Sequence, residues 1–187
     1  MKPTELNIVT HLANSDFLDF RKNYACVPNV TYGFNWGNWE SDLLVVSKSG
    51  YLTEVEVKVT LADWKADKKK AWFKTTNWWD PRFKSLTYFY YAAPAELAQR
   101  WPEVGIPDFA GVLGVDFNNA YSPVVLRKAQ RNPEAKKVGL ARMHALARLG
   151  SMRSWTTRNT IDGLQQRIAD LEAKNSIDKK NKAVLLS

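Results

Sequence analysis

The sequence predicts an α/β protein, in which a mixed sheet is flanked by helices and followed by a helical C-terminal extension. Apolar patterns over the first two thirds of the chain follow the order helix, three strands, helix, strand. Beyond Asn132 the composition shifts to Ala, Arg and Lys, which predicts helices. The 187 residues, 45% of them hydrophobic, suffice for a core of ordinary size. We therefore expect a main domain over residues 1–132 and a basic helical extension over 133–187.

The first half of the main domain is predicted as a helix and three strands. Apolar residues at near-helical spacing predict a helix over 3–14. A mixed segment, 17–30, predicts a strand that ends at Pro28 and Asn29. The continuous apolar run Leu43–Val46 is typical of a central strand and lies within 39–47. A turn at 48–50 then leads into the strictly alternating segment 51–59, which predicts a hairpin.

The second half begins at a helix-capping pattern. Thr60 and Asp63 have the spacing of a capping box and predict a helix over 60–73. Residues 74–84 are expected to form a loop. The remaining patterns predict strands over 86–92, 109–115 and 124–127 and a short helix over 94–101.

The C-terminal extension is predicted to contain two helices, 134–149 and 154–174, separated by Gly150 and Ser151. In the second helix Ile161, Leu164, Ile168 and Leu171 follow 3,4,3 spacing. Such a stripe is either docked on the main domain or is the seam of a short coiled coil, which would form a homodimer through the helix 154–174. Residues 179–187 are expected to fray.

The net charge of +8 is concentrated in the last third of the chain. Residues 1–126 hold 13 basic and 14 acidic residues, whereas residues 127–187 hold 14 basic and 5 acidic residues. A basic segment of this kind favours binding to a polyanion such as DNA, because neutralised phosphates release counterions. The alternative is a solvated basic tail that only aids solubility.

The composition also excludes several classes of site and location. With one cysteine, Cys26, and two histidines, His11 and His144, the chain lacks material for an internal disulfide or a thiolate zinc site. No apolar run approaches the ~20 residues that cross a bilayer, and the first residues do not resemble a secretory signal. We expect a soluble, cytoplasmic protein with Cys26 as a buried free thiol.

Acidic residues and one lysine gather on the predicted hairpin. Antiparallel pairing about Ser49 and Gly50 places Asp42 opposite about residue 57, near Glu54 and Glu56. Two carboxylates with water suit Mg²⁺, and Lys58, on the same face as Glu56, is placed to orient a water molecule or stabilise phosphate charge. The alternative is that these charges lie on the solvated face of an amphipathic strand.

The order Asp42, then Glu56-Val57-Lys58, resembles the PD-(D/E)XK nuclease superfamily, with Ser41 at the proline position. Three segments resemble the MmcB-like DNA-repair nucleases more closely: TEVEVKVTLADWKADKKKAW (53–72), LTYFYYAAPAEL (86–97) and VGIPDFAGVLGVD (104–116). The resemblance covers about residues 3 to 130. It implies a restriction-endonuclease-like core, in which Asp42 and Glu56 bind Mg²⁺ or Mn²⁺ and Lys58 assists the hydrolytic water. It further implies a third metal-binding carboxylate at Glu5. Glu40 and Glu54 are auxiliary acidic residues beyond the minimal motif, so which of these carboxylates bind the metal directly is open.

The function implied is metal-dependent hydrolysis of DNA phosphodiester bonds in DNA repair or processing, in the cytoplasm of a bacterial or phage-infected cell. The alternative is a catalytically inactive DNA-binding or scaffold protein with the same fold. RNA is a further substrate that the residues do not separate from DNA.

Basic residues outside the acidic group are candidates for phosphate contact. We expect this role for Lys65, Lys68, Lys69, Lys74, Arg82, Lys84, Arg127, Lys128 and Arg131. Four aromatic residues are interleaved with them and either stack on unpaired bases or pack in the core: Trp72, Trp78, Trp79 and Phe83.

Overall fold

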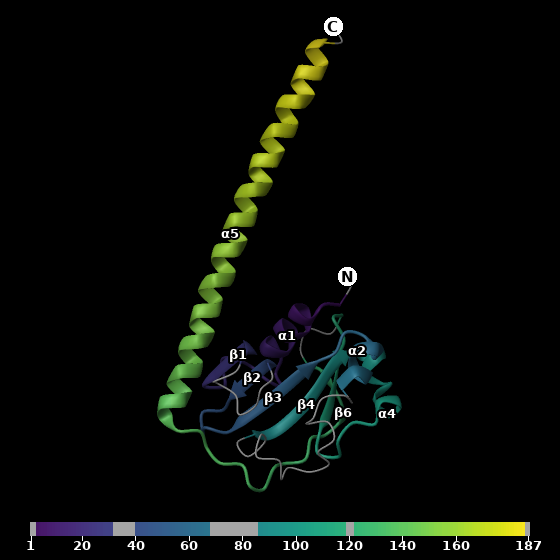
Figure 1. Ribbon diagram of the computed structural model, residues 1–187, viewed down its shortest axis with the longest axis vertical. Coiled ribbons are helices and arrows are strands. Elements are labelled where there is room, and N and C mark those ends of the chain that lie inside the picture. The colour runs from purple at the N-terminus through teal and green to yellow at the C-terminus, as the bar shows by residue number, and fades with distance from the viewer. Residues whose placement is uncertain (1–2, 32–39, 68–85, 119–121, 186–187) are drawn as a thin grey trace. The chain divides into compact units, whose positions relative to one another are not determined.

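A six-stranded mixed sheet forms the centre of the protein in our computed structural model, which describes residues 3–31, 40–67, 86–118 and 122–185 (Figure 1). The strands lie in the order β1 (Ala25–Val30), β2 (Ser41–Val46), β3 (Leu52–Val57), β4 (Leu86–Pro94), β5 (Gly111–Val115) and β6 (Val124–Arg127). The pairs β3–β4 and β4–β5 are parallel, and the other three are antiparallel. The helices are α1 (Glu5–Asn14), α2 (Leu61–Ala66), α3 (Ala95–Ala98), α4 (Trp101–Val104) and α5 (Leu140–Leu185). The predicted α/β class, with flanking helices and a C-terminal helix, is confirmed.

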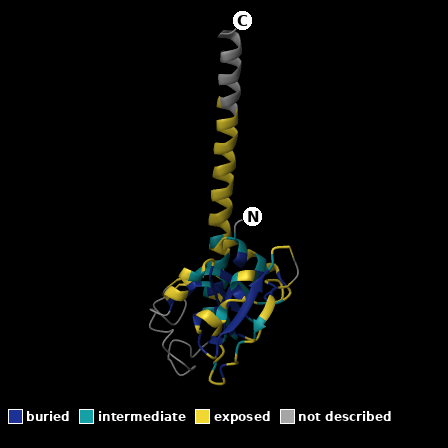
Figure 2. Cartoon of the chain, turned by 90° about the vertical axis from the view of Figure 1, so that its right-hand side faces the viewer, coloured by how far each residue is buried: buried dark blue, intermediate teal, exposed yellow. Residues whose placement is uncertain are grey.

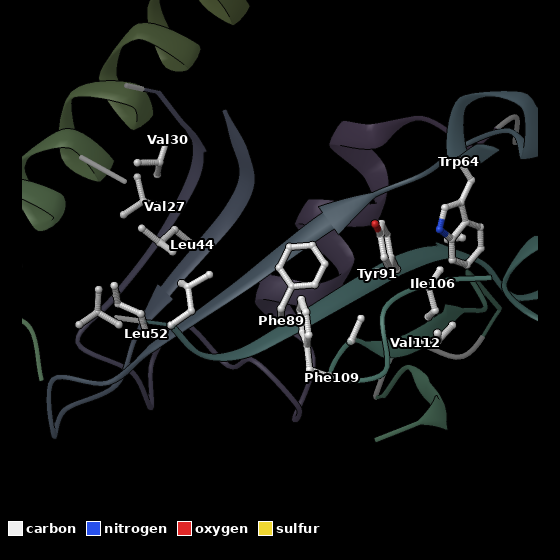
Figure 3. Close-up of a cluster of buried hydrophobic side chains, with 14 of the residues drawn as sticks. Val27, Val30, Leu44, Leu52, Trp64, Phe89, Tyr91, Ile106, Phe109 and Val112 are labelled. Atoms are coloured by element: carbon white, nitrogen blue, oxygen red, sulfur yellow. The ribbon is translucent and has the colours of Figure 1, made fainter. Parts of the chain in front are cut away.

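Helices cover both faces of the sheet. Ile8, Val9 and Leu12 of α1 pack with residues of one face of β2 and β3. The core on the opposite face contains Trp64 of α2 and Leu146 of α5, together with residues of α3 and α4. Figure 3 shows part of this cluster, including Trp64, Phe89 and Tyr91. The central strands are accordingly buried almost throughout, as their dark ribbons in Figure 2 show. The polar side chains of Glu54 and Glu56, which share one face of β3, are therefore removed from solvent.

The chain divides into two compact units, Met1–Gly150 and Ser151–Ser187. The first unit extends past the predicted boundary at residue 132, because Val138, Met143 and Leu146 belong to its buried core. Helix α5 supplies residues to both units. Within the described ranges, no helix combines the length and apolar character needed to cross a membrane.

The predicted strand over 17–30 is much shorter in the structure, where β1 begins only at Ala25. The preceding residues form turns, since the Asp19 carboxylate accepts hydrogen bonds from the backbone N–H of Arg21 at 2.9 Å and from its Nε at 2.8 Å. The Asp19 carbonyl also accepts the backbone N–H of Lys22 at 3.0 Å. Local side-chain bonds of this kind compete with strand pairing.

The predicted helices of the extension are also wrong in their boundaries. Residues 134–139 are not helical, and α5 continues through Gly150 and Ser151 without a break. A Cβ atom at Gly150 would lie 3.3 Å from Cγ2 of Val27, so the glycine permits close approach to β1 and does not end the helix. The predicted helix over 94–101 is two short helices, α3 and α4, and β5 begins at Gly111 instead of residue 109.

The turn between β2 and β3 sets the register of the hairpin. Gly50 has a φ of 87°, which favours glycine, and its N–H donates to the Ser47 carbonyl at 2.9 Å. The Ser47 hydroxyl accepts the Tyr51 N–H at 3.0 Å. Leu43 then pairs with Val55. Continuing this ladder places Asp42 opposite Glu56, one residue from the predicted position.

Candidate functional site

The β2–β3 register, continued by one residue past the Leu43–Val55 pair, places Asp42 opposite Glu56. Opposite residues in an antiparallel pair have Cα atoms ~4.5–5.5 Å apart. Oδ2 of Asp42 accepts the backbone N–H of Val57 at 2.6 Å. This bond fixes the orientation of the Asp42 carboxylate at the end of β3, beside Glu56.

Lys58 completes a buried ion-pair group directly after β3. Its backbone N–H donates to the Ala92 carbonyl at 2.8 Å, which extends the parallel pairing with β4. Its Nζ lies 2.8 Å from Oε1 of Glu56 and 3.1 Å from Oδ2 of Asp67. The side chains of Lys58, Glu56 and Asp67 are only 4%, 5% and 2% exposed. Buried charges of this kind require partners, and here one ammonium lies between two carboxylates.

Helix α2 brings Asp67 to this group. The Thr60 hydroxyl accepts the Asp63 N–H at 3.1 Å, so the predicted N-cap is confirmed. Trp64 and Asp67, three residues apart, are both buried, and the Trp64 ring lies 5.4 Å from that of Tyr91. The described part of the helix ends at Ala66, and the rest of the predicted helix 60–73 lies outside the described residues.

The acidic face of β3 is buried, so the alternative of a solvated face is wrong. Glu54 is 1% exposed and lies between Leu44 of β2 and Phe89 of β4. Burial raises the pKa of the Tyr91 hydroxyl well above its usual value, and the charges of Asp67 and Glu56 raise it further. The alternation along β3 correctly predicts that Glu54 and Glu56 share one face of the strand. That face is covered by helices and is not exposed to solvent.

The negative charge of Glu56 raises the pKa of both Asp42 and Glu5. Burial, followed by the charge of Glu56, raises the pKa of the Asp42 carboxyl to about 8, although the Val57 hydrogen bond and Lys58 oppose the shift. Burial, followed by the charges of Glu40 and Glu56, also raises the pKa of Glu5. Grouped carboxylates repel one another, and a bound cation would relieve this cost.

The donor atoms fit a hard divalent cation. Mg²⁺ binds carboxylate oxygens and keeps several water ligands, so a carboxylate pair such as Asp42 and Glu56 is a suitable donor set. Among the residues that the structure describes, no three acidic, His or Cys side chains are grouped closely enough to hold an ion. Glu5, expected as a third ligand, lies close enough for the charge of Glu56 to contribute to its raised pKa.

Four of the predicted phosphate-contacting residues lie within the described ranges. Lys65, Lys128 and Arg131 are exposed. Arg131 lies over the Tyr51 ring at 5.8 Å, near the opposite end of β3 from Glu56. Arg127 lies over the Trp101 ring at 5.1 Å. The other expected residues lie outside the described ranges: Lys68, Lys69, Lys74, Arg82 and Lys84, with Trp72, Trp78, Trp79 and Phe83.

Arg127 is engaged within the protein. Its Nη2 lies 3.5 Å from Oδ1 of Asp108 and also donates to the Asp108 carbonyl. With the Trp101 contact, these bonds hold the guanidinium against the first unit. Arg127 is accordingly a weaker candidate for phosphate contact than the exposed Lys128.

Asp67 and Tyr91 were missed by the sequence reasoning. A usable signal for Asp67 is its i,i+3 spacing from Trp64, which places both on one helix face. Tyr91 pairs with Glu56 across β3 and β4, but only the parallel register reveals it.

Fold and site together define an α/β protein with a mixed sheet whose β2–β3 pair carries a buried group of acidic residues and a lysine. No family model and no curated protein matches the chain. A solved structure of a protein of unknown function from Silicibacter pomeroyi is similar, with 18% sequence identity and a TM-score of 0.53. The match covers 87% of this chain and 94% of that chain. At this identity the likeness concerns the fold alone.

Proposed function

We propose that this protein is a metal-dependent nuclease that hydrolyses phosphodiester bonds of DNA during repair or processing. The observation that carries the proposal is the meeting of three charged residues at the ends of two adjacent strands. Asp42 lies opposite Glu56, and the Glu56 carboxylate is 2.8 Å from the Lys58 ammonium. Two carboxylates and an ammonium in this arrangement suit phosphodiester hydrolysis.

The carboxylates provide the binding site for Mg²⁺ or Mn²⁺. A divalent ion bound there would supply Lewis-acid polarisation of a phosphate oxygen. Asp42 is held in one orientation by the Val57 N–H, and Glu56 by the Lys58 ammonium. Such supporting bonds reduce the reorganisation needed when a ligand binds.

Lys58 orients water and offsets the negative charge that develops on the phosphate. Its ammonium is held between Glu56 and Asp67, which limits its conformations. A preorganised charge in a water-poor environment stabilises a transition state more effectively than a freely moving one. Asp67 thus acts as a positioning residue for Lys58.

The second candidate is a DNA-binding or scaffold protein that does not cleave. It is favoured by the 4% exposure of the Lys58 side chain between two carboxylates, an arrangement that also occurs in structural ion-pair networks. In either case the basic segment 127–187 supplies affinity for phosphates.

Cleavage assays on labelled duplex, branched and single-stranded DNA, and on RNA, test the proposal in Mg²⁺, Mn²⁺ or EDTA. Asp42→Asn and Glu56→Gln keep side-chain size and an oxygen acceptor for Val57 and Lys58, but remove the charge that binds the ion. Glu96→Gln, at an exposed position of α3, is the matched control. We expect cleavage to fall at least about 100-fold in the first two variants.

The unchanged control would show that the loss is specific to the site. Circular dichroism would establish that each variant is folded. If no nucleic acid is cut in any metal, while salt-sensitive DNA binding is equal in all variants, the scaffold function replaces the nuclease. Cleavage of RNA alone would retain the chemistry and change the substrate.

A further inference from the structure

The second unit contains an apolar stripe on an exposed helix. Ile161, Leu164, Ile168 and Leu171 of α5 have relative exposures of 49%, 54%, 56% and 60%. Their 3,4,3 spacing places them on one side of the helix. The outer side is polar, since Gln166 Nε2 donates to Asp170 Oδ1 at 3.1 Å. A stripe of four large apolar residues in water favours an association that covers it.

The residue types in the stripe favour a pair of helices. In heptad terms, Ile161 and Ile168 occupy positions a, and Leu164 and Leu171 occupy positions d. Ile at a with Leu at d favours two-stranded parallel coiled coils.

The charges beside the stripe are complementary between two copies. Arg167 occupies position g and Glu172 position e of the following heptad. In a parallel, in-register pair, Arg167 of each copy faces Glu172 of the other, so the contact occurs twice. In the antiparallel arrangement, g positions face each other and bring together the basic residues Arg167 and Lys174. The charge pattern therefore selects the parallel orientation.

We propose that two copies of this chain associate through residues 161–174 as a parallel, in-register coiled coil. The interface is short, so the dimer forms reversibly and its population rises with protein concentration. The inference goes beyond the proposed nuclease function and holds whether or not the protein cleaves DNA.

Sedimentation equilibrium of the full chain, over a wide range of concentration, tests this association. We expect the mass to rise from 21.3 kDa toward that of a dimer. Ile168→Asp, which places a charge at position a of the stripe, should abolish the rise. Trp155→Ser removes a large exposed apolar residue that lies at position b, outside the stripe, and should leave dimerisation unchanged.

Charge reversal tests the orientation. Arg167→Glu or Glu172→Arg alone should weaken the dimer about 2- to 30-fold, since each removes two exposed ion pairs. The double variant should restore it. Leu164→Cys in a Cys26→Ser background should form a disulfide between copies under oxidation, because equivalent d positions meet in the parallel pair.

Three results would overturn the proposal. One is a chain that stays monomeric at every concentration; if Ile168→Asp then lowers its melting temperature, the stripe is covered by the same chain. Another is a dimer that survives Ile168→Asp, which would require a different surface. The third is a failure of the double charge reversal to restore association.

Discussion

Removal of the Asp67 charge is the most direct test of the buried ion-pair group. Asp67→Asn keeps the size of the side chain and an oxygen acceptor, but leaves the Lys58 ammonium with one fewer carboxylate. Breaking a buried pair costs ~3–5 kcal/mol when the remaining charge has no compensation. Because Lys58 still contacts Glu56 at 2.8 Å, we expect a smaller loss, about 2 kcal/mol, in the free energy of unfolding. For a chain of this length, that loss lowers the melting temperature by about 4–8 °C.

Urea unfolding followed by circular dichroism measures this loss. Asp162→Asn, at an exposed position of α5, is the matched control and should change stability by less than about 0.5 kcal/mol. In a double-mutant cycle with Lys58→Met, the combined loss should be smaller than the sum of the single losses, because the two residues share one interaction. Equal stability of Asp67→Asn and the parent protein, or strict additivity in the cycle, would refute the reasoning.

Three further predictions concern positions outside the site. The hydrogen bond from the Arg21 side chain lowers the pKa of Asp19 to about 2. The ionised Asp19 carboxylate therefore stabilises the folded protein fully at pH values above about 4, the pKa of aspartate in the unfolded chain. This stabilisation is lost as the pH falls toward 2. Urea unfolding between pH 2 and 5 should show a shallower acid loss in Asp19→Asn, and identical pH profiles would contradict this. Cys26, expected to be buried, is half-buried. Burial still raises the pKa of its thiol to about 12, so Ellman's reagent at pH 8 should react much more slowly with the native than with the unfolded protein; equal rates would contradict this. Gly50→Ala should destabilise by about 1–2 kcal/mol because φ is 87°, whereas Gly163→Ala, with open space in α5, should favour the helix; thermal melts that show the same sign for both would contradict the argument.

The local signals in the sequence predicted their elements well. Helix α1, the hairpin of β2 and β3, the Thr60 cap and strand β6 follow from periodicity, turn residues and hydrogen-bonding side chains within a few residues. Segments that depend on distant contacts were predicted less well. Glycine usually indicates a helix break, so Gly150 was expected to end a helix. In the structure it lies inside α5, where the absence of a side chain permits close approach to Val27, far away in the sequence.

The candidate site shows the same division. The order of Asp42, Glu56 and Lys58, and the turn between them, suffice to predict that all three lie near one another, because a tight turn folds one strand back on the next. The role of Asp67 could not be found in that motif, because the residue reaches Lys58 only through the packing of α2. Nor could the motif show that Glu5 lies outside any close three-ligand group among the described residues.

The sequence by itself determined which residues alternate along β3, because alternation is a property of the extended backbone and needs no neighbour. It also determined the excess of basic charge in the last third and the heptad spacing in α5. Only the tertiary structure decided that Glu54, Glu56 and Lys58 are buried, since burial depends on helices that cover the second face of the sheet. The sequence alone allows these charged residues to lie on a solvated strand face. The packing of the helices instead buries Glu56 and Lys58 in an ion-pair group with Asp67.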